Sequence, residues 1–318
     1  MKSSVLVLLV ASCFAASATV SAQSYPVKPV RVVTAVGGGG ETITRVIAQK
    51  MGESMGQPVI VESQTGASGS VGANMIARAA PDGYNILYAA TNSQVYRLVL
   101  SKNTPYDPVK DFTPISLLSD AVLVVAVPAN SSIRNMRDFV EQAKGGKLFY
   151  GTSGVGTTHH LSGELLQLAA NIKLTHVPFK DPSLVATELI GGRLDTGFGI
   201  FGTMYQQHTS GKLRIIAINN VKRYSRTPDI PTVGEGVPGY EPPPGWNGFF
   251  GPGNLPRPIV QRLNTEIHKA SNAPDMKERF DQLGFIMTLS TPEELDAVLK
   301  RDLPRAAKIV KDAAIPIE

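Results

Sequence analysis

Two glycine-rich segments, each placed between an apolar run and a helical pattern, carry the residues best suited to chemistry. They cover residues 34–42 and 151–160. Glycine lets a ligand approach the backbone closely, and the first N–H groups of a helix lack partners within it. Together with the helix dipole, these groups favour a bound anion. The candidate contact residues are Val36, Gly37, Gly38, Gly39, Glu41 and Thr42 in the first segment, and Ser153, Gly154, Gly156, Thr157, Thr158 and His160 in the second.

Each segment taken alone is also compatible with an ordinary tight turn, because glycine is the default turn residue. The second segment, however, contains more Gly, Ser and Thr than a turn requires. The hydroxyls of Ser153, Thr157 and Thr158 are neutral hydrogen-bond donors. Two such segments on two lobes would suit an elongated molecule with a carboxylate at one or both ends.

The motifs of several enzyme classes are absent from the sequence. Ser153 lies in Gly-Thr-Ser-Gly-Val rather than in a G-x-S-x-G turn, and Lys147 is followed by Leu148 instead of completing a P-loop. The histidines show no metal-ligand spacing. We therefore expect no catalytic residues, no metal and no cofactor. The remaining enzymatic hypothesis is an exported hydrolase that uses Ser153 and His160, for which no third triad member is evident.

Short apolar runs alternate with helical patterns along most of the chain. Asn135 with Asp138, and Thr291 with Glu294, match the capping patterns that begin helices. Pro304 is expected to kink or end the last helix. The alternation predicts an α/β fold with mainly parallel sheets flanked by helices. The expected strands cover residues 30–33, 59–61, 85–90, 122–127, 148–150, 174–177, 196–198 and 213–218.

Composition disfavours several other classes of protein. Of the 318 residues, 42% are hydrophobic and 18% are charged, which is typical of a folded chain of roughly two domains. The net charge is +5, but the longest basic cluster is only Lys222 with Arg223, so we expect no nucleic-acid partner. Cys13 is the only cysteine, which disfavours a disulfide framework and a thiolate metal site.

Residues 1–22 are typical of an export signal. Lys2 precedes an apolar segment that begins at Val5, and residues 20–22 place small side chains where a signal peptidase reads them. We predict cleavage before Gln23, which leaves a mature chain without cysteine. A second hypothesis makes Cys13 a lipid-modified residue that tethers the protein to a membrane.

A series of short motifs across essentially the whole mature chain resembles the Bug family of tripartite tricarboxylate transporter substrate-binding receptors. The order and spacing of the motifs are more specific than any one of them. The matching stretches are YPVKPVR (25–31), GQPV (56–59), APDGY (80–84), PYDPVKDF (105–112), SGVGTTHH (153–160), HVPFK (176–180), GGRLD (191–195), PTV (231–233) and PGYE (238–241), followed by Trp246.

The resemblance implies a two-lobed periplasmic receptor of the Venus-flytrap type, which closes on a small carboxylate. Such a receptor hands its ligand to the membrane permease subunits of a tripartite tricarboxylate transporter. The first lobe is expected to comprise residues 23–126 and 244–318, and the second lobe residues 127–243. Trp246 is expected to pack where the lobes meet. An alternative partner is a sensor kinase, to which the receptor would report its ligand.

The resemblance also adds residues to the expected site. Glu41 precedes the position where the family usually has Asp, which is Thr42 here, and Gly199 stands where an Asp is common. Facing a ligand, Glu41 would oppose an anion, whereas facing solvent it would complement the helix dipole, the orientation that we favour. The added residues are Thr91 and Asn92 in the first lobe, and Phe179, Lys180 and Gly199 in the second.

Overall fold

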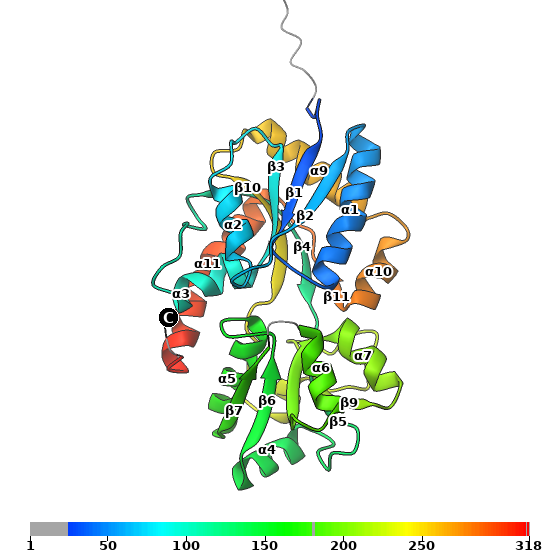
Figure 1. Cartoon of the computed structure of the whole chain (residues 1–318), viewed down its shortest axis with the longest axis vertical. Coiled ribbons are helices and arrows are strands. Elements are labelled where there is room, and N and C mark those ends of the chain that lie inside the picture. The colour runs from blue at the N-terminus through cyan, green and yellow to red at the C-terminus, as the bar shows by residue number, and fades with distance from the viewer. Residues whose placement is uncertain (1–24, 180–181, 316, 318) are drawn as a thin grey trace, which may run out of the picture.

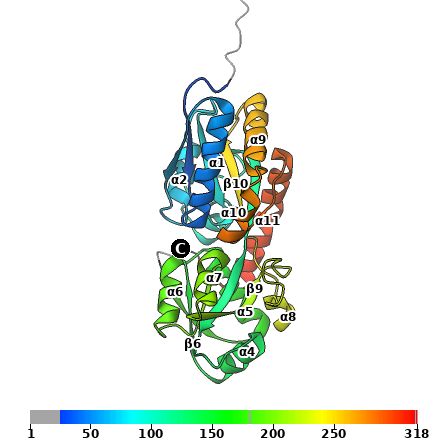
Figure 2. The ribbon, with the colours of Figure 1, turned by 90° about the vertical axis from the view of Figure 1, so that its right-hand side faces the viewer.

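The protein is organised as two lobes stacked along the long axis of the molecule (Figure 1). The computed structural model describes residues 25–179, 182–315 and 317. Each lobe is built around one β-sheet with helices on both of its faces (Figure 2). The predicted signal peptide lies outside the described residues. In the part of the chain that the structure describes, no helix is both long and apolar enough to cross a membrane.

The first lobe contains a six-stranded sheet. Its strands are β1 (Val30–Thr34), β2 (Val59–Ser63), β3 (Asn85–Ala90), β4 (Phe112–Ala121), β10 (Trp246–Pro252) and β11 (Phe285–Met287). They lie in the order β11-β4-β10-β3-β1-β2, with β1 parallel to both β2 and β3. Most of β1 is buried, as expected of a central strand that is covered on both faces.

Helices pack on both faces of the first sheet. They are α1 (Gly39–Met55), α2 (Ser70–Ala77), the π-helix η1 (Asn92–Tyr96), α3 (Arg97–Leu100), α9 (Arg257–Ser271), α10 (Met276–Leu283) and α11 (Pro292–Asp312). Ile43, Ile47 and Met51 of α1 recur at helical spacing and join Leu263 and Ile267 of α9 in one buried cluster. Side chains of α2, η1, α3 and α11 form a second cluster. Both apolar faces of this sheet are therefore covered.

The second lobe has a five-stranded sheet in the order β7-β6-β8-β5-β9. Its strands are β5 (Leu123–Pro128), β6 (Leu148–Thr152), β7 (Leu174–Pro178), β8 (Thr196–Ile200) and β9 (Leu213–Asn219). Its helices are α4 (Met136–Gly145), α5 (Thr158–Ala170), α6 (Pro182–Ile190), α7 (Phe201–Thr209) and α8 (Val233–Gly236). One buried cluster includes side chains of α4, α5 and α8, and another includes side chains of α6 and α7.

The two-lobed α/β fold is as predicted, but the prediction of mainly parallel sheets is wrong. In the first sheet, β10 is antiparallel to β3 and β4, and β11 is antiparallel to β4. In the second sheet, β5 is antiparallel to β8 and β9. Strands β5 and β10 each arrive from the opposite lobe and run away from the boundary. Strands that lead into a helix at the boundary run toward it, so each sheet becomes mixed.

The chain crosses between the lobes earlier than the sequence suggested. β4 of the first sheet ends at Ala121 and β5 of the second begins at Leu123, so the predicted boundary between residues 126 and 127 falls inside β5. The sequence pattern failed here because the apolar run continues through the crossing without interruption. The return to the first lobe ends at Trp246, which is buried and donates from Nε1 to Asp302 Oδ2 at 2.9 Å.

Candidate ligand-binding site

The first glycine-rich segment forms the turn between β1 and α1. Gly38 precedes α1 with φ at 60°, a left-handed value that favours glycine. Because Gly38 has no side chain, no side-chain hydrogen bond caps the first turn of α1. Gly37 and Gly38 are exposed, and Val36 and Gly39 are half-buried. The N–H and hydroxyl of Thr42 both donate back to the carbonyl of Gly38, at 3.1 and 3.2 Å.

The N-terminus of α1 lies at the boundary between the lobes. A Cβ added at Gly39 would lie 3.5 Å from the carbonyl oxygen of Leu283 in α10. A Cβ added at Gly202, in α7 of the second lobe, would lie 2.6 Å from the same oxygen. The uncapped end of α1 is therefore close to the second lobe.

Glu41 forms an ion pair within the first lobe. Its Oε1 accepts from Nη2 and Nε of Arg45 at 2.6 and 3.1 Å, and its Oε2 accepts from the hydroxyl of Ser63 at 2.8 Å. The hydrogen bonds from Arg45 and then Ser63 hold the pKa of Glu41 below its usual value. The sequence left open whether Glu41 faces a ligand or solvent. In the structure its charge is balanced by Arg45.

Residues predicted for the site on opposite lobes come into contact at Thr158. Asn92 Oδ1 accepts from the backbone N–H of Thr158 at 3.1 Å and from its hydroxyl at 2.9 Å. The hydroxyls of Thr91 and Thr158 are 3.4 Å apart. Asn92 begins η1, and Thr158 begins α5, so the first N–H of α5 is already bonded to the other lobe. These residues join the lobes in the arrangement observed.

Residues 153–157 connect β6 to α5, and we call this segment the 153–157 turn. Gly154 and Gly156 have positive φ values of 116° and 74°. Thr157 caps α5, since its Oγ1 accepts from the N–H of His160 at 3.4 Å, and its hydroxyl donates to Gly154 O at 2.8 Å. The hydroxyls of Thr157 and Thr158 are thus engaged within the protein.

Ser153 pairs with His159 rather than with His160. The hydroxyl of Ser153 is hydrogen-bonded to Nδ1 of His159. Within the described residues, Nε2 of His159 is buried and has no hydrogen-bond partner, so no carboxylate orients the ring as a triad requires. Burial lowers the pKa of His159 to about 4, which keeps its imidazole neutral at pH 7. The hydrolase hypothesis therefore paired Ser153 with the wrong histidine. The pair that the structure shows, Ser153 with His159, lacks the carboxylate of a catalytic triad among the described residues.

The other predicted site residues of the second lobe do not all converge. Phe179 is half-buried next to the 153–157 turn, and its N–H donates to the carbonyl of Thr152 at 2.9 Å. Lys180 lies outside the described residues. A Cβ added at Gly199 would lie 2.4 Å from Cε of Met204, so that side of Gly199 faces the cluster under α7. An Asp in place of Gly199 would meet the core rather than the turn.

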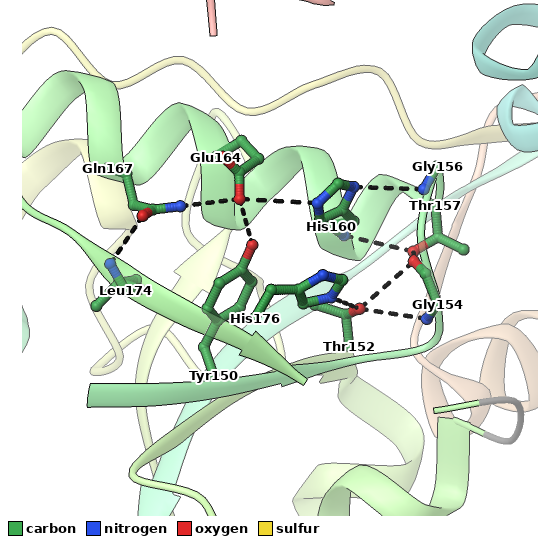
Figure 3. Close-up of polar contacts among 10 residues, drawn as sticks. All are labelled: Tyr150, Thr152, Gly154, Gly156, Thr157, His160, Glu164, Gln167, Leu174 and His176. Carbon is green, nitrogen blue, oxygen red and sulfur yellow. Dashed lines mark hydrogen bonds and ion pairs between the residues drawn. The ribbon is translucent and has the colours of Figure 1, made fainter. Parts of the chain in front are cut away.

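A polar network behind the 153–157 turn was not predicted (Figure 3). His160 stacks on His176, with ring centroids 4.3 Å apart, and Glu164 Oε1 accepts from the hydroxyl of Tyr150 at 2.5 Å. The i,i+4 spacing of His160 and Glu164 is readable in the sequence. The contact with His176 depends on the pairing of β6 with β7, which places Tyr150 opposite His176. Among the described residues, no group of three or more His, Cys, Asp or Glu could hold a metal ion.

Two lobes joined by crossing strands, with glycine-rich turns at their boundary, define a two-lobed binding protein. The chain matches the tripartite tricarboxylate transporter family receptor, TctC, over residues 43–315. It is 34% identical over 293 residues to a UPF0065 protein encoded between tcbD and tcbE in Pseudomonas sp. strain P51, covering 90% of this chain and 87% of that protein. The chain therefore belongs to the TctC family of receptors, which includes the Bug proteins, as the motifs predicted.

Solved structures of related proteins have the same fold. The periplasmic binding protein BugD is 31% identical with a TM-score of 0.81, covering 92% of this chain and 99% of that one. Rpa4515 of Rhodopseudomonas palustris, solved with adipate, is 26% identical with a TM-score of 0.85 and coverages of 92% and 99%. MatC of the same organism, solved with malate, is 27% identical with a TM-score of 0.80 and coverages of 90% and 100%.

Proposed function

We propose that the protein is a periplasmic receptor that captures a small carboxylate between its lobes and delivers it to a tripartite tricarboxylate-type transporter. The observation that carries this proposal is the glycine-rich, uncapped N-terminus of α1 at the boundary between the lobes. Such a helix end supplies backbone N–H groups and a favourable dipole for an anion. Adipate and malate, found with two relatives, are both small carboxylates.

The proposed contacts divide into two groups. Backbone N–H groups of residues 37–41 and the hydroxyl of Ser153 bind the carboxylate, directly or through ordered water. Asn92, Thr91 and Thr158 hold the lobes together around it. Closure then creates the surface that the permease recognises. Export to the periplasm follows from the signal peptide predicted at residues 1–22.

Binding without catalysis is the second part of the proposal. The support is the environment of Ser153, whose partner His159 has no orienting carboxylate among the described residues. An imidazole whose pKa is lowered to about 4 and that has no orienting partner is a weak general base for a serine hydroxyl. With its proton on Nδ1, His159 donates to the oxygen of Ser153, and the Ser153 hydroxyl then keeps its hydrogen for a bound carboxylate.

Thermal unfolding of residues 23–318, refolded to remove any co-purified ligand, tests the proposal. The protein is screened against mono-, di- and tricarboxylates, with neutral and cationic analogues of the same size as controls. A ligand at 100 times its Kd adds about 2.7 kcal/mol to the free energy of unfolding, a rise in Tm of roughly 5 °C. Stabilisation by carboxylates alone supports the proposal. Stabilisation by neutral or cationic analogues alone contradicts it.

A further inference from the structure

Two stacked imidazole rings lie directly behind the 153–157 turn (Figure 3). The rings of His160, in α5, and His176, in β7, are inclined by 20° to each other. Tyr150, in β6, stacks on His176 with ring centroids 4.8 Å apart. Side chains from β6, α5 and β7 therefore pack together where the 153–157 turn leaves β6.

Each ring accepts a hydrogen bond on the side of the turn. Nδ1 of His160 accepts from the backbone N–H of Gly156 at 3.3 Å. Thr152 Oγ1 lies 2.6 Å from Nε2 of His176 and accepts from the N–H of Gly154 at 3.2 Å. We assign the Thr152 hydroxyl as the donor to His176, because its other acceptor, Gly154 O, is 3.4 Å away. The N–H of Gly156 is thus bonded directly to a ring nitrogen, and the N–H of Gly154 is connected to one through the Thr152 hydroxyl.

We propose that His160 and His176 are positioning residues, whose neutral rings accept the hydrogen bonds that fix the 153–157 turn, so that protonating His160 releases the turn and weakens ligand binding. A protonated imidazole has two N–H donors and no acceptor. Protonated His160 would present an N–H to the N–H of Gly156. The effect on the ligand rests on the proposed function, whereas the effect on the turn does not.

The surroundings of the rings favour the neutral form. Burial, and to a smaller extent the neighbouring charge of a protonated His160, together lower the pKa of His176 to about 4. Burial also lowers the pKa of His160, although Glu164, 3.7 Å from its Nε2, opposes this. Glu164 is in turn held by Tyr150 at 2.5 Å and Gln167 at 2.9 Å. Because both histidine pKa values are lowered, the rings stabilise the turn above about pH 6.5, and this stabilisation is lost as the pH falls toward 4.

NMR of the ligand-free protein, residues 23–318, tests the effect on the turn. The amide of Gly156 and the ring signals of His160 and His176 are followed from pH 8 to pH 4. The expected result is that the Gly156 amide shifts and loses protection from exchange over the same pH range in which the His160 ring takes up a proton. A Gly156 amide that stays unchanged while the rings titrate would overturn the proposal.

Two variants of His160 separate positioning from packing. His160→Asn keeps an acceptor near the place of Nδ1 but cannot titrate, so the Gly156 amide should stay protected at low pH. His160→Phe keeps the stacked ring but removes the acceptor, so the amide should lose protection at every pH. Equal pH profiles for the wild type and His160→Asn would contradict the proposal.

His208→Asn is the matched control, because Nδ1 of His208 also accepts from a backbone N–H, that of Ile215 at 3.4 Å. His208 lies in α7 of the same lobe, whereas His160 lies in α5. The control variant should reproduce the wild-type profile of Gly156. If it removes the pH dependence instead, His208 and not the stacked pair is responsible.

Calorimetry with malate as the probe adds the second readout. Wild-type affinity should fall on acidification by at most about tenfold per pH unit for each proton taken up, and His160→Asn should flatten this dependence. His160→Phe should bind about fivefold more weakly at pH 8, the effect of one neutral hydrogen bond. An affinity independent of pH in the wild type contradicts the coupling. If malate does not bind at any pH, that result counts against the proposed ligand class. The NMR result then tests the effect of His160 protonation on the 153–157 turn by itself.

Discussion

Arg45 balances the charge of Glu41 in the first turn of α1, beside the proposed anion site. Arg45→Gln removes the cation that balances Glu41 and leaves a carboxylate in the first turn of α1. We expect the affinity for a carboxylate to fall by roughly two- to fivefold, since the pair is partly exposed and such pairs contribute at most about 1 kcal/mol. Calorimetry at low salt measures this change.

The double variant Glu41→Gln with Arg45→Gln removes both charges and should restore the wild-type affinity. Lys300→Gln is the matched control, because Lys300 forms an i,i+4 pair with Asp296 in α11, in the same lobe. A similar loss in Lys300→Gln would mean that net charge, rather than the Glu41 pair, sets the affinity.

A substitution of Ser153 tests whether its hydroxyl serves binding or catalysis. Ser153→Ala should weaken carboxylate binding about fivefold, because one neutral donor is lost. Hydrolysis of a p-nitrophenyl ester should proceed at the buffer rate in both proteins, since His159 has no orienting carboxylate among the described residues. Ester hydrolysis by the wild type that disappears in Ser153→Ala would revive the hydrolase hypothesis.

The sequence predicted which residues belong to the candidate site, but it did not predict their hydrogen-bond partners. The glycines, Ser153 and Thr158 could be found because a strand-to-helix turn is a local pattern. The contact of Thr158 with Asn92 joins positions 66 residues apart, and no local pattern encodes it. The partner of Ser153 was assigned to His160, whereas consecutive helix residues point about 100° apart, so the path of the turn selects His159.

At the scale of elements, the turn before α1 requires a glycine at position 38. Gly38→Ala adds a Cβ that meets nothing within 4 Å, so its cost is the left-handed φ of 60° alone. We expect a loss of about 1 kcal/mol, measured as a decrease in Tm of roughly 2–4 °C. Gly145→Ala, which also meets open space but is not at a left-handed φ, should leave the Tm within 1–2 °C of the wild type, since surface changes of this kind cost about 0.5 kcal/mol or less. Equal losses in the two variants would contradict the argument.

Local signals predicted where helices begin better than where they end. Asn135 accepts from the N–H of Asp138, and Thr291 forms the full capping box with Glu294. Pro304 was predicted to kink or end the last helix. It does not end the helix, because α11 continues through it to Asp312, and the kink stays a prediction. Buried Leu299 and Ala306 on either side of Pro304 pack against the first lobe, and this packing compensates for the one lost N–H. Strand direction could not be predicted either, because hydrophobicity marks a strand without orienting it.

For the whole molecule, the contact of Asn92 with Thr158 is a link between lobes that must separate to admit a ligand. Asn92→Leu removes the acceptor for both donors of Thr158, which leaves the N–H of Thr158 without a partner and its hydroxyl with only the longer contact to Thr91 when the lobes are closed. We expect the ligand-free protein to open, with a larger radius of gyration in small-angle X-ray scattering. Carboxylate affinity should fall about tenfold, because closure loses two hydrogen bonds.

Asn92→Asp should close the ligand-free protein, the opposite of Asn92→Leu, but should also weaken carboxylate binding. A carboxylate at the N-terminus of α5 bonds more strongly to the N–H of Thr158, so the ligand-free protein should become more compact. Its negative charge beside the site should nevertheless weaken binding of an anion. Asn74→Leu is the control, because Asn74 accepts from Arg78 within one lobe. If Asn92→Leu and Asn92→Asp change the radius of gyration in the same direction, Asn92 does not link the lobes.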